Sequence, residues 1–226
     1  MIIAVISDIH SNLDELDRVL EKIDSDIILC CGDIVGYYTW PNECIEKIRQ
    51  IKAISVTGNH DFACVTGDTD GFNLYAEKTI KWAVKIIKDE NIEFLSMLKP
   101  KIKLEIEGTD IMLVHGSPRN PIEEYVFPQT PDSTLKSFIK DENVDILIMG
   151  HTHVPFIKKF GNKLVLNPGS VGQPRDNDKK ASFAILDLSK RNARICRVGY
   201  DIDKVVDGLK LKGLPLFLGK RLYMGI

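Results

Sequence analysis

The chain has 226 residues, enough for one large domain, and its 44% hydrophobic and 27% charged residues are typical of a globular protein. Its formal net charge of −2 gives no sign of a nucleic-acid-binding protein, although a local basic patch stays open because net charge does not report distribution. No apolar stretch approaches the roughly 18 residues that a membrane-spanning helix needs, so we expect no membrane partner.

The N-terminal apolar run is too short for a signal-peptide core and has no basic flank, so we interpret it as a buried strand. The chain has an odd number of cysteines without metal-finger spacing: Cys30, Cys31, Cys44, Cys64 and Cys196. We expect free, mostly buried thiols and a cytoplasmic protein.

In the first half of the chain, short apolar runs alternate with helical patterns. Spacing predicts a helix over Leu13–Ile23, where Asn12 and Glu15 have the spacing of a capping box. A second helix is predicted over Pro41–Ile51, with proline at its start. Buried strands are predicted at Ile2–Ser7, Asp26–Cys31 and Ala53–Thr57. This β-α-β-α-β order predicts parallel pairing.

A longer helix is predicted over Asn73–Glu90, because Ile80, Ala83, Val84 and Ile87 share one face. The remaining elements are a hairpin, a helix, five short strands and a helical tail. They are expected at Lys101–Glu107, Asp110–His115, Thr130–Asp141, Asp145–Met149, Phe156–Phe160, Lys163–Asn167, Ser182–Leu188, Arg194–Val198 and 201–226, the last broken near Gly213-Leu214-Pro215. The pattern predicts two packed sheets with helices outside, in a single domain over residues 1–226.

Five polar clusters each follow an apolar, strand-like run. They are Asp8-Ile9-His10, Gly32-Asp33, Gly58-Asn59-His60-Asp61, His115-Gly116 and Gly150-His151-Thr152-His153. Because α/β folds place their sites at the carboxyl ends of strands, these clusters can meet at one location. All five histidines of the chain lie in them, whereas structural histidines would be scattered.

The residue types in these clusters suit a particular kind of metal. Imidazole, carboxylate and an amide oxygen bind borderline divalent ions such as manganese, iron, zinc or nickel. Cysteine is absent from the set, which argues against a closed structural zinc site. In an extended segment, Asp-x-His and His-x-His would direct alternate residues to one side.

In this order, the five clusters resemble the calcineurin-like metallophosphoesterase superfamily, whose pattern is D-x-H, G-D, G-N-H-[DE], H and G-H-x-H. Further segments resemble its small, single-domain prokaryotic branch: Gly32–Tyr37 with Pro41–Cys44, His115–Arg119 and Asn167–Arg175. The resemblance covers nearly the whole chain. It implies an α/β fold, a four-layer αββα sandwich of two mixed β-sheets flanked by helices, in agreement with the predicted elements.

The resemblance also implies roles for individual residues. Asp8, His10 and His153 would hold one ion, Asn59, His115 and His151 the other, and Asp33 would bridge the two. A bridging carboxylate sets two ions roughly 3.5–4 Å apart, where they activate a water molecule as nucleophile. His60 would protonate or stabilise the leaving oxygen. Asp61 would orient His60, with a structural hydrogen bond as the alternative.

Four other residues are candidate substrate contacts. Arg119 and Arg175 could clamp phosphate, with solvated surface arginine as the alternative. The segment from Gly169 and Ser170 to Gly172 could offer N–H groups to an anion, or could be a turn required by the fold. Three aromatic residues, Tyr37, Tyr38 and Trp40, could line a nucleoside base, but we expect them to pack.

The expected function is metal-dependent hydrolysis of a phosphodiester in a small, nucleotide-like molecule by a metal-bridging hydroxide. Alternatives are a dinucleoside polyphosphate hydrolase, a protein phosphatase and, last, a non-catalytic protein-binding scaffold. The complete ligand set with His60 favours catalysis. The cofactors would be two divalent ions, manganese first, with iron, zinc or nickel as alternatives. The tail over 201–226 would cover the sheet or make a homodimer contact.

Overall fold

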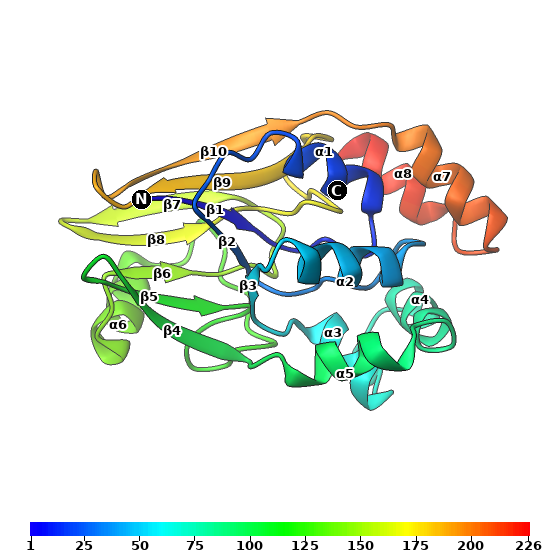
Figure 1. The fold of residues 1–226 in the computed structure, drawn as a ribbon, viewed down its shortest axis with the longest axis horizontal. Coiled ribbons are helices and arrows are strands. Elements are labelled where there is room, and N and C mark those ends of the chain that lie inside the picture. Colours follow the sequence, from blue (N-terminus) through cyan, green and yellow to red (C-terminus); the bar gives the residue numbers. More distant parts are fainter.

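The computed structural model describes residues 1–226 and consists of two five-stranded mixed sheets with helices outside them (Figure 1). The first sheet has the order β10-β9-β1-β2-β3 and the second the order β4-β5-β6-β8-β7. The strands of the first sheet are β1 (Ile2–Ile6), β2 (Ile27–Cys30), β3 (Ile54–Ser55), β9 (Ala181–Asp187) and β10 (Asn192–Val198). Those of the second are β4 (Lys101–Ile106), β5 (Thr109–Val114), β6 (Ile146–Ile148), β7 (Phe156–Phe160) and β8 (Lys163–Asn167).

The strand pairing confirms the predicted parallel core and hairpin. β1 pairs in parallel with β2, and β2 with β3, while β9 lies antiparallel to β1. In the second sheet, β4 and β5 form the antiparallel hairpin, and β5, β6 and β8 run parallel. Each sheet therefore directs the carboxyl ends of its parallel strands toward one edge.

Eight helices cover the sheets and one end of the molecule. They are α1 (Leu13–Leu20), α2 (Pro41–Gln50), α3 (Asn59–Thr66), α4 (Leu74–Val84), α5 (Asp89–Met97), α6 (Asp132–Glu142), α7 (Ile202–Leu211) and α8 (Phe217–Met224). No helix combines the length and apolar character needed to cross a lipid bilayer.

Three apolar clusters separate the four layers of the fold. Between the sheets, Ile3 and Leu29 of the first sheet share a cluster with Ile111 and Ile148 of the second. The outer face of the first sheet packs against α1, α2, α4 and α5, and that of the second against α6. The four-layer αββα prediction is confirmed.

The helical tail packs against the chain that follows β2. Tyr37 and Tyr38 share a buried cluster with Leu209 of α7 and Leu218 of α8. The Tyr38 hydroxyl also donates to the Leu218 carbonyl over 3.3 Å. The predicted packing role of these tyrosines is thus observed, with Tyr38 fully buried.

Two predictions about helices are wrong. The single helix expected over Asn73–Glu90 is divided between α4 and α5, because the Asn42 side chain binds the backbone at the break. Its amide donates to the Ile86 carbonyl, and its oxygen accepts the Lys88 N–H, each over 2.9 Å. Val84, expected on the buried face, is 40% exposed.

The capping box expected at the start of α1 is also absent. Asn12 makes no side-chain cap hydrogen bond. Its amide donates instead to the Glu15 carboxylate and to the Gly172 carbonyl. These two buried residues therefore connect α1 to the loop after β8.

The cysteine prediction agrees with the structure. All five thiols are free, and four are buried. Only Cys196 is partly exposed.

Candidate metal centre

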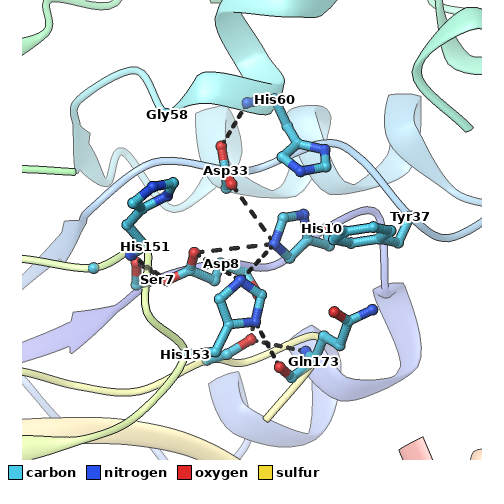
Figure 2. Close-up of polar contacts among 12 residues, drawn as sticks. Ser7, Asp8, His10, Asp33, Tyr37, Gly58, His60, His151, His153 and Gln173 are labelled. Atoms are coloured by element: carbon cyan, nitrogen blue, oxygen red, sulfur yellow. Dashed lines mark hydrogen bonds and ion pairs between the residues drawn. The ribbon is translucent and has the colours of Figure 1, made fainter. Parts of the chain in front are cut away.

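Side chains from both sheets converge where the parallel strands end (Figure 2). Asp8 follows β1, Asp33 follows β2, and His115 and His151 follow β5 and β6. Three buried groups have ligand atoms within 4.8 Å of one another: Asp8 with His10 and His153, Asp33 with His115 and His151, and His10 with Asp33 and His60. The first two groups contain the residues predicted for two separate ions, and the third joins Asp33 and His10 to His60.

Asp33 lies between the two groups. Its Oδ2 atom is 3.6 Å from His10 Nε2 and 3.5 Å from His115 Nε2. Its Oδ1 atom accepts the backbone N–H of His60 over 2.9 Å, which fixes the plane of the carboxylate. One carboxylate oxygen therefore faces a histidine from each group.

Asn59 completes the second group with an amide oxygen. Its Oδ1 lies 3.2 Å from His115 Nε2, which is also 3.0 Å from His151 Nδ1. All seven predicted metal ligands are thus brought together by the fold.

The inward-facing imidazole nitrogens present lone pairs to one another. His115 Nδ1 lies 2.7 Å from the Cys31 carbonyl oxygen, and His153 Nδ1 lies 2.6 Å from that of Gln173. Because a carbonyl only accepts, each Nδ1 carries the proton and each Nε2 is left with a lone pair. His10 Nδ1 faces the Val35 carbonyl in the same way, at 3.3 Å.

This tautomer pattern fits a bound cation. His10 Nε2 and His153 Nε2 lie 3.1 Å apart, although both rings donate from Nδ1. Two lone pairs at this separation repel each other unless a positive ion lies between them. Carbonyl groups that fix the outer nitrogen are also the usual support for metal-binding histidines.

Asp8 is prepared for a cation in the same manner. Its Oδ2 accepts the Ser7 hydroxyl and the His151 backbone N–H, whereas the buried Oδ1 has no hydrogen-bond partner and faces His153 Nε2 at 3.3 Å. Burial raises the pKa of Asp8 to about 7 and lowers the pKa values of His10 and His153. Neutral imidazole is the form that binds metal, so the donor set fits a divalent ion.

The ligand loops are held in an unusual backbone conformation. Five of the predicted ligands have positive φ angles: Asp8 (54°), His10 (52°), Asp33 (53°), His151 (67°) and His153 (61°). The expectation that Asp-x-His and His-x-His are extended is therefore wrong. Left-handed backbone is costly outside glycine and concentrates at functional sites, where the surrounding structure enforces it.

Comparison with known proteins identifies the family. A model of the calcineurin-like phosphoesterase superfamily domain matches residues 1–191. The chain belongs to the calcineurin-like phosphoesterase superfamily. The predicted family is thereby confirmed.

Two curated proteins and one solved structure are similar to this chain over most of its length. An uncharacterized protein of Methanocaldococcus jannaschii is 41% identical over 99% of this chain and 98% of its own length. A phosphodiesterase of the same organism is 25% identical over 86% of this chain and 97% of its own length. The crystal structure of a metallophosphoesterase from Sphaerobacter thermophilus has a TM-score of 0.87 at 34% identity, covering 100% of this chain and 99% of its own. Such relatives support a phosphoester hydrolase.

His60 lies beside the candidate metal centre, on the first turn of α3. Its ring centroid is 4.6 Å from that of His10, 4.7 Å from Tyr37 and 5.0 Å from Phe72. Its buried Nδ1 has no hydrogen-bond partner. No helix was predicted at this segment from the sequence, so α3 (Asn59–Thr66) was missed.

The Asp61 carboxylate makes no hydrogen bond to the His60 ring. Its Oδ1 accepts the Val35 N–H over 3.0 Å, and its Oδ2 accepts the Gly58 N–H over 3.1 Å. The carboxylate thus joins the start of α3 to the loop that follows Asp33. These hydrogen bonds are structural, which was the alternative to the prediction that Asp61 orients His60.

The two candidate arginines differ in their surroundings. Arg119 is exposed, pairs with Glu124 and lies over the Phe138 ring, so the structure does not direct it toward the metal centre. Arg175 donates to Gln173, whose carbonyl supports His153, and lies over the Tyr37 ring. Only Arg175 is next to the ligand groups.

Gly169 and Ser170 are part of a turn rather than an open anion site. The Gly169 N–H donates to Asn167 Oδ1, and the Ser170 hydroxyl donates to the Asp8 carbonyl. The N–H groups of Val171 and Gly172 bind the carbonyls of Ser7 and Asp8. Because these donors are engaged by protein acceptors, the turn supports the Asp8 loop, and the anion-binding prediction is not supported.

Sequence reasoning missed the groups that support the ligands. They are Ser7, which binds Asp8, and the carbonyls of Cys31, Val35 and Gln173. It also missed Tyr125, whose ring stacks on His151 with centroids 3.9 Å apart. Proximity to the His115 motif in sequence was the only available signal.

Proposed function

We propose that this protein hydrolyses phosphodiesters of nucleotide-like molecules with two divalent ions bound at the centre. One ion would be held by Asp8, His10 and His153, the other by Asn59, His115 and His151, and Asp33 would contact both. The observation that carries this proposal is the place of Asp33 Oδ2, within 3.6 Å of a histidine from each group. Manganese is the first candidate, with iron, zinc or nickel as alternatives.

The bound ions and the protein side chains would have different roles in catalysis. When bound, two divalent ions lower the pKa of water and neutralise phosphate charge. The buried carboxylates and imidazoles would hold the ions in fixed positions, because backbone hydrogen bonds orient these side chains. Electrostatic stabilisation by such preorganised groups is usually the largest contribution to catalysis.

His60 would assist the departing ester oxygen. Burial lowers its pKa, so the ring is neutral in the free site. An anionic phosphate beside the ring favours the protonated form, which can then donate the proton to the leaving oxygen. The backbone of His60 is tied to Asp33, which places the ring next to the centre.

The small number of arginines beside the candidate ligands favours a diester substrate over a monoester. A monoester carries one more negative charge, and a site built for it usually supplies further cations. Arg119 is already paired with Glu124, which leaves Arg175 as the arginine beside the ligands. The similarity to a phosphodiesterase supports the same preference.

The test compares bis-p-nitrophenyl phosphate with p-nitrophenyl phosphate in the presence of manganese or nickel. We expect a higher kcat/KM for the diester, loss of activity with chelator and recovery on addition of metal. His115→Ala, which removes a predicted ligand, is the matched inactive control. A clear monoester preference would overturn the diester assignment, and activity that survives complete metal removal would overturn the metal mechanism.

A further inference from the structure

An exposed aromatic pair lies next to the predicted metal ligand His151. The Tyr125 ring stacks on the His151 ring, with centroids 3.9 Å apart and planes inclined by 27°. The Phe127 ring is nearly parallel to Tyr125, at 9° and 5.9 Å. His151 is 3% exposed, whereas Tyr125 and Phe127 are 53% and 42% exposed. The three rings therefore lead from the centre to solvent.

The loop that carries these aromatics is anchored so that they point outward. Val126, between them, is buried in the cluster that joins α6 to the second sheet. Its neighbours on either side must therefore face away from that cluster. Their exposure follows from this alternation rather than from disorder.

Polar contacts fix the same loop on its other side. Glu124 accepts the Ser117 hydroxyl and the Arg119 guanidinium, whose Nε donates over 2.9 and 2.7 Å. The Gly116 N–H donates to the Pro121 carbonyl over 2.6 Å. The motif that holds His115 and the residue preceding Tyr125 are thus joined in one braced segment. Arg119 is therefore one of the contacts that hold this segment.

The Tyr125 ring lies against a predicted ligand of the centre, because it stacks on His151. Much of the residue is nevertheless open to solvent. A flat ring that enters with a phosphate at the centre would therefore meet an ordered aromatic surface.

We propose that Tyr125 and Phe127 form the subsite for the nucleobase of a nucleotide diester whose phosphate lies at the metal centre. The inference rests on the proposed function and specifies its substrate class. Base–aromatic stacking needs no particular base, because every base has a π-face. The subsite would therefore favour nucleotide esters over alkyl esters while tolerating different bases.

The experiment uses two diesters with the same leaving group, p-nitrophenyl thymidine 5′-phosphate and methyl p-nitrophenyl phosphate. With manganese, the wild type should prefer the thymidine ester by about tenfold in kcat/KM, the scale of one stacked base. Tyr125→Leu and Phe127→Leu should reduce this ratio, mainly through KM, and Tyr125→Phe should preserve it because the ring is kept. Tyr223→Leu, which removes an exposed tyrosine from α8, is the control that should leave the ratio unchanged.

The outcomes separate the subsite from the proposed function. Hydrolysis of neither ester by the wild type would refute the proposed function. Hydrolysis of both at equal efficiency would refute only the subsite. An equal fall on both esters in Tyr125→Leu would also refute it, because Tyr125 would then support His151 rather than recognise the base. Competitive inhibition by thymidine 5′-phosphate, weakened in Tyr125→Leu but not in Tyr223→Leu, would supply the binding readout.

Discussion

The backbone N–H of His60 donates a 2.9 Å hydrogen bond to Oδ1 of Asp33, so the start of α3 and the loop after β2 are joined at the centre (Figure 2). The bond leaves Oδ2 of Asp33 to face His10 and His115. In Asp33→Asn, the remaining carbonyl oxygen would accept the His60 N–H and turn the NH₂ group toward the imidazoles. That group carries no lone pair for a metal.

Asp33→Asn should therefore weaken both metal sites, whereas His153→Ala should weaken mainly one. Elemental analysis after reconstitution should give about two ions per chain for the wild type, clearly fewer than one for Asp33→Asn and about one for His153→Ala. Full metal content and activity in Asp33→Asn would refute the bridging role.

His60 should be needed for turnover more than for metal binding. His60→Gln should reduce kcat on the order of 10²–10⁴-fold for a poor leaving group, and less for p-nitrophenolate, which needs little protonation. Metal content should remain as in the wild type. Because His60 shares a compact group with His10 and Asp33, loss of metal with equal loss on both substrates would instead make it a ligand.

The predictable part of this structure rests on local signals that repeat along the chain. Each ligand cluster follows a buried strand, so the shared edge of parallel strands was enough to bring Asp8, Asp33 and His151 together. Where short apolar runs alternate with amphipathic helices, parallel pairing of buried strands is the expected arrangement. For these reasons the sheets, the site and the family were accessible from the sequence.

The errors come from contacts between distant residues. The break between α4 and α5 depends on Asn42, which precedes Ile86 by 44 positions and satisfies the backbone there. The positive φ angles of Asp8 and His10 are imposed by surrounding loops and have no sequence period. Arg119 was a candidate phosphate contact because it follows the His115 motif, but it pairs with Glu124. Periodicity and spacing contain none of this information.

Gly36 lies directly against the imidazole rings of His10 and His60. A Cβ atom at this position would lie 2.6 Å from His10 Nδ1 and 2.7 Å from His60 Nδ1, and φ is +139°. Gly36→Ala should therefore displace both rings and lower activity at least tenfold, in addition to backbone strain on the order of 1 kcal/mol. Activity and thermal unfolding would be measured together.

Gly161→Ala is the control for backbone strain alone. Gly161 also has a positive φ, +64°, but a Cβ there would meet nothing within 4 Å. It should lose stability through φ and retain activity. If Gly36→Ala behaved like Gly161→Ala, the close approach at Gly36 would have no functional role.

Glu15 should make the stability of the protein depend on pH. This carboxyl is fully buried on α1, and its Oε1 has no hydrogen-bond partner. Burial raises the pKa of Glu15 well above its usual 4.5. The folded state therefore binds the proton more tightly than the unfolded state, so the free energy of unfolding should fall as pH rises from 4.5 through the folded pKa.

Glu15→Gln keeps the shape and the acceptor for Asn12 but cannot ionise. It should be more stable than the wild type at pH 8, on the order of 1–3 kcal/mol, with a smaller difference near pH 4. Denaturant unfolding at both pH values measures this, with Glu21→Gln at an exposed position as the control. A difference between wild type and Glu15→Gln that stays constant with pH would contradict the ionisation of a buried Glu15.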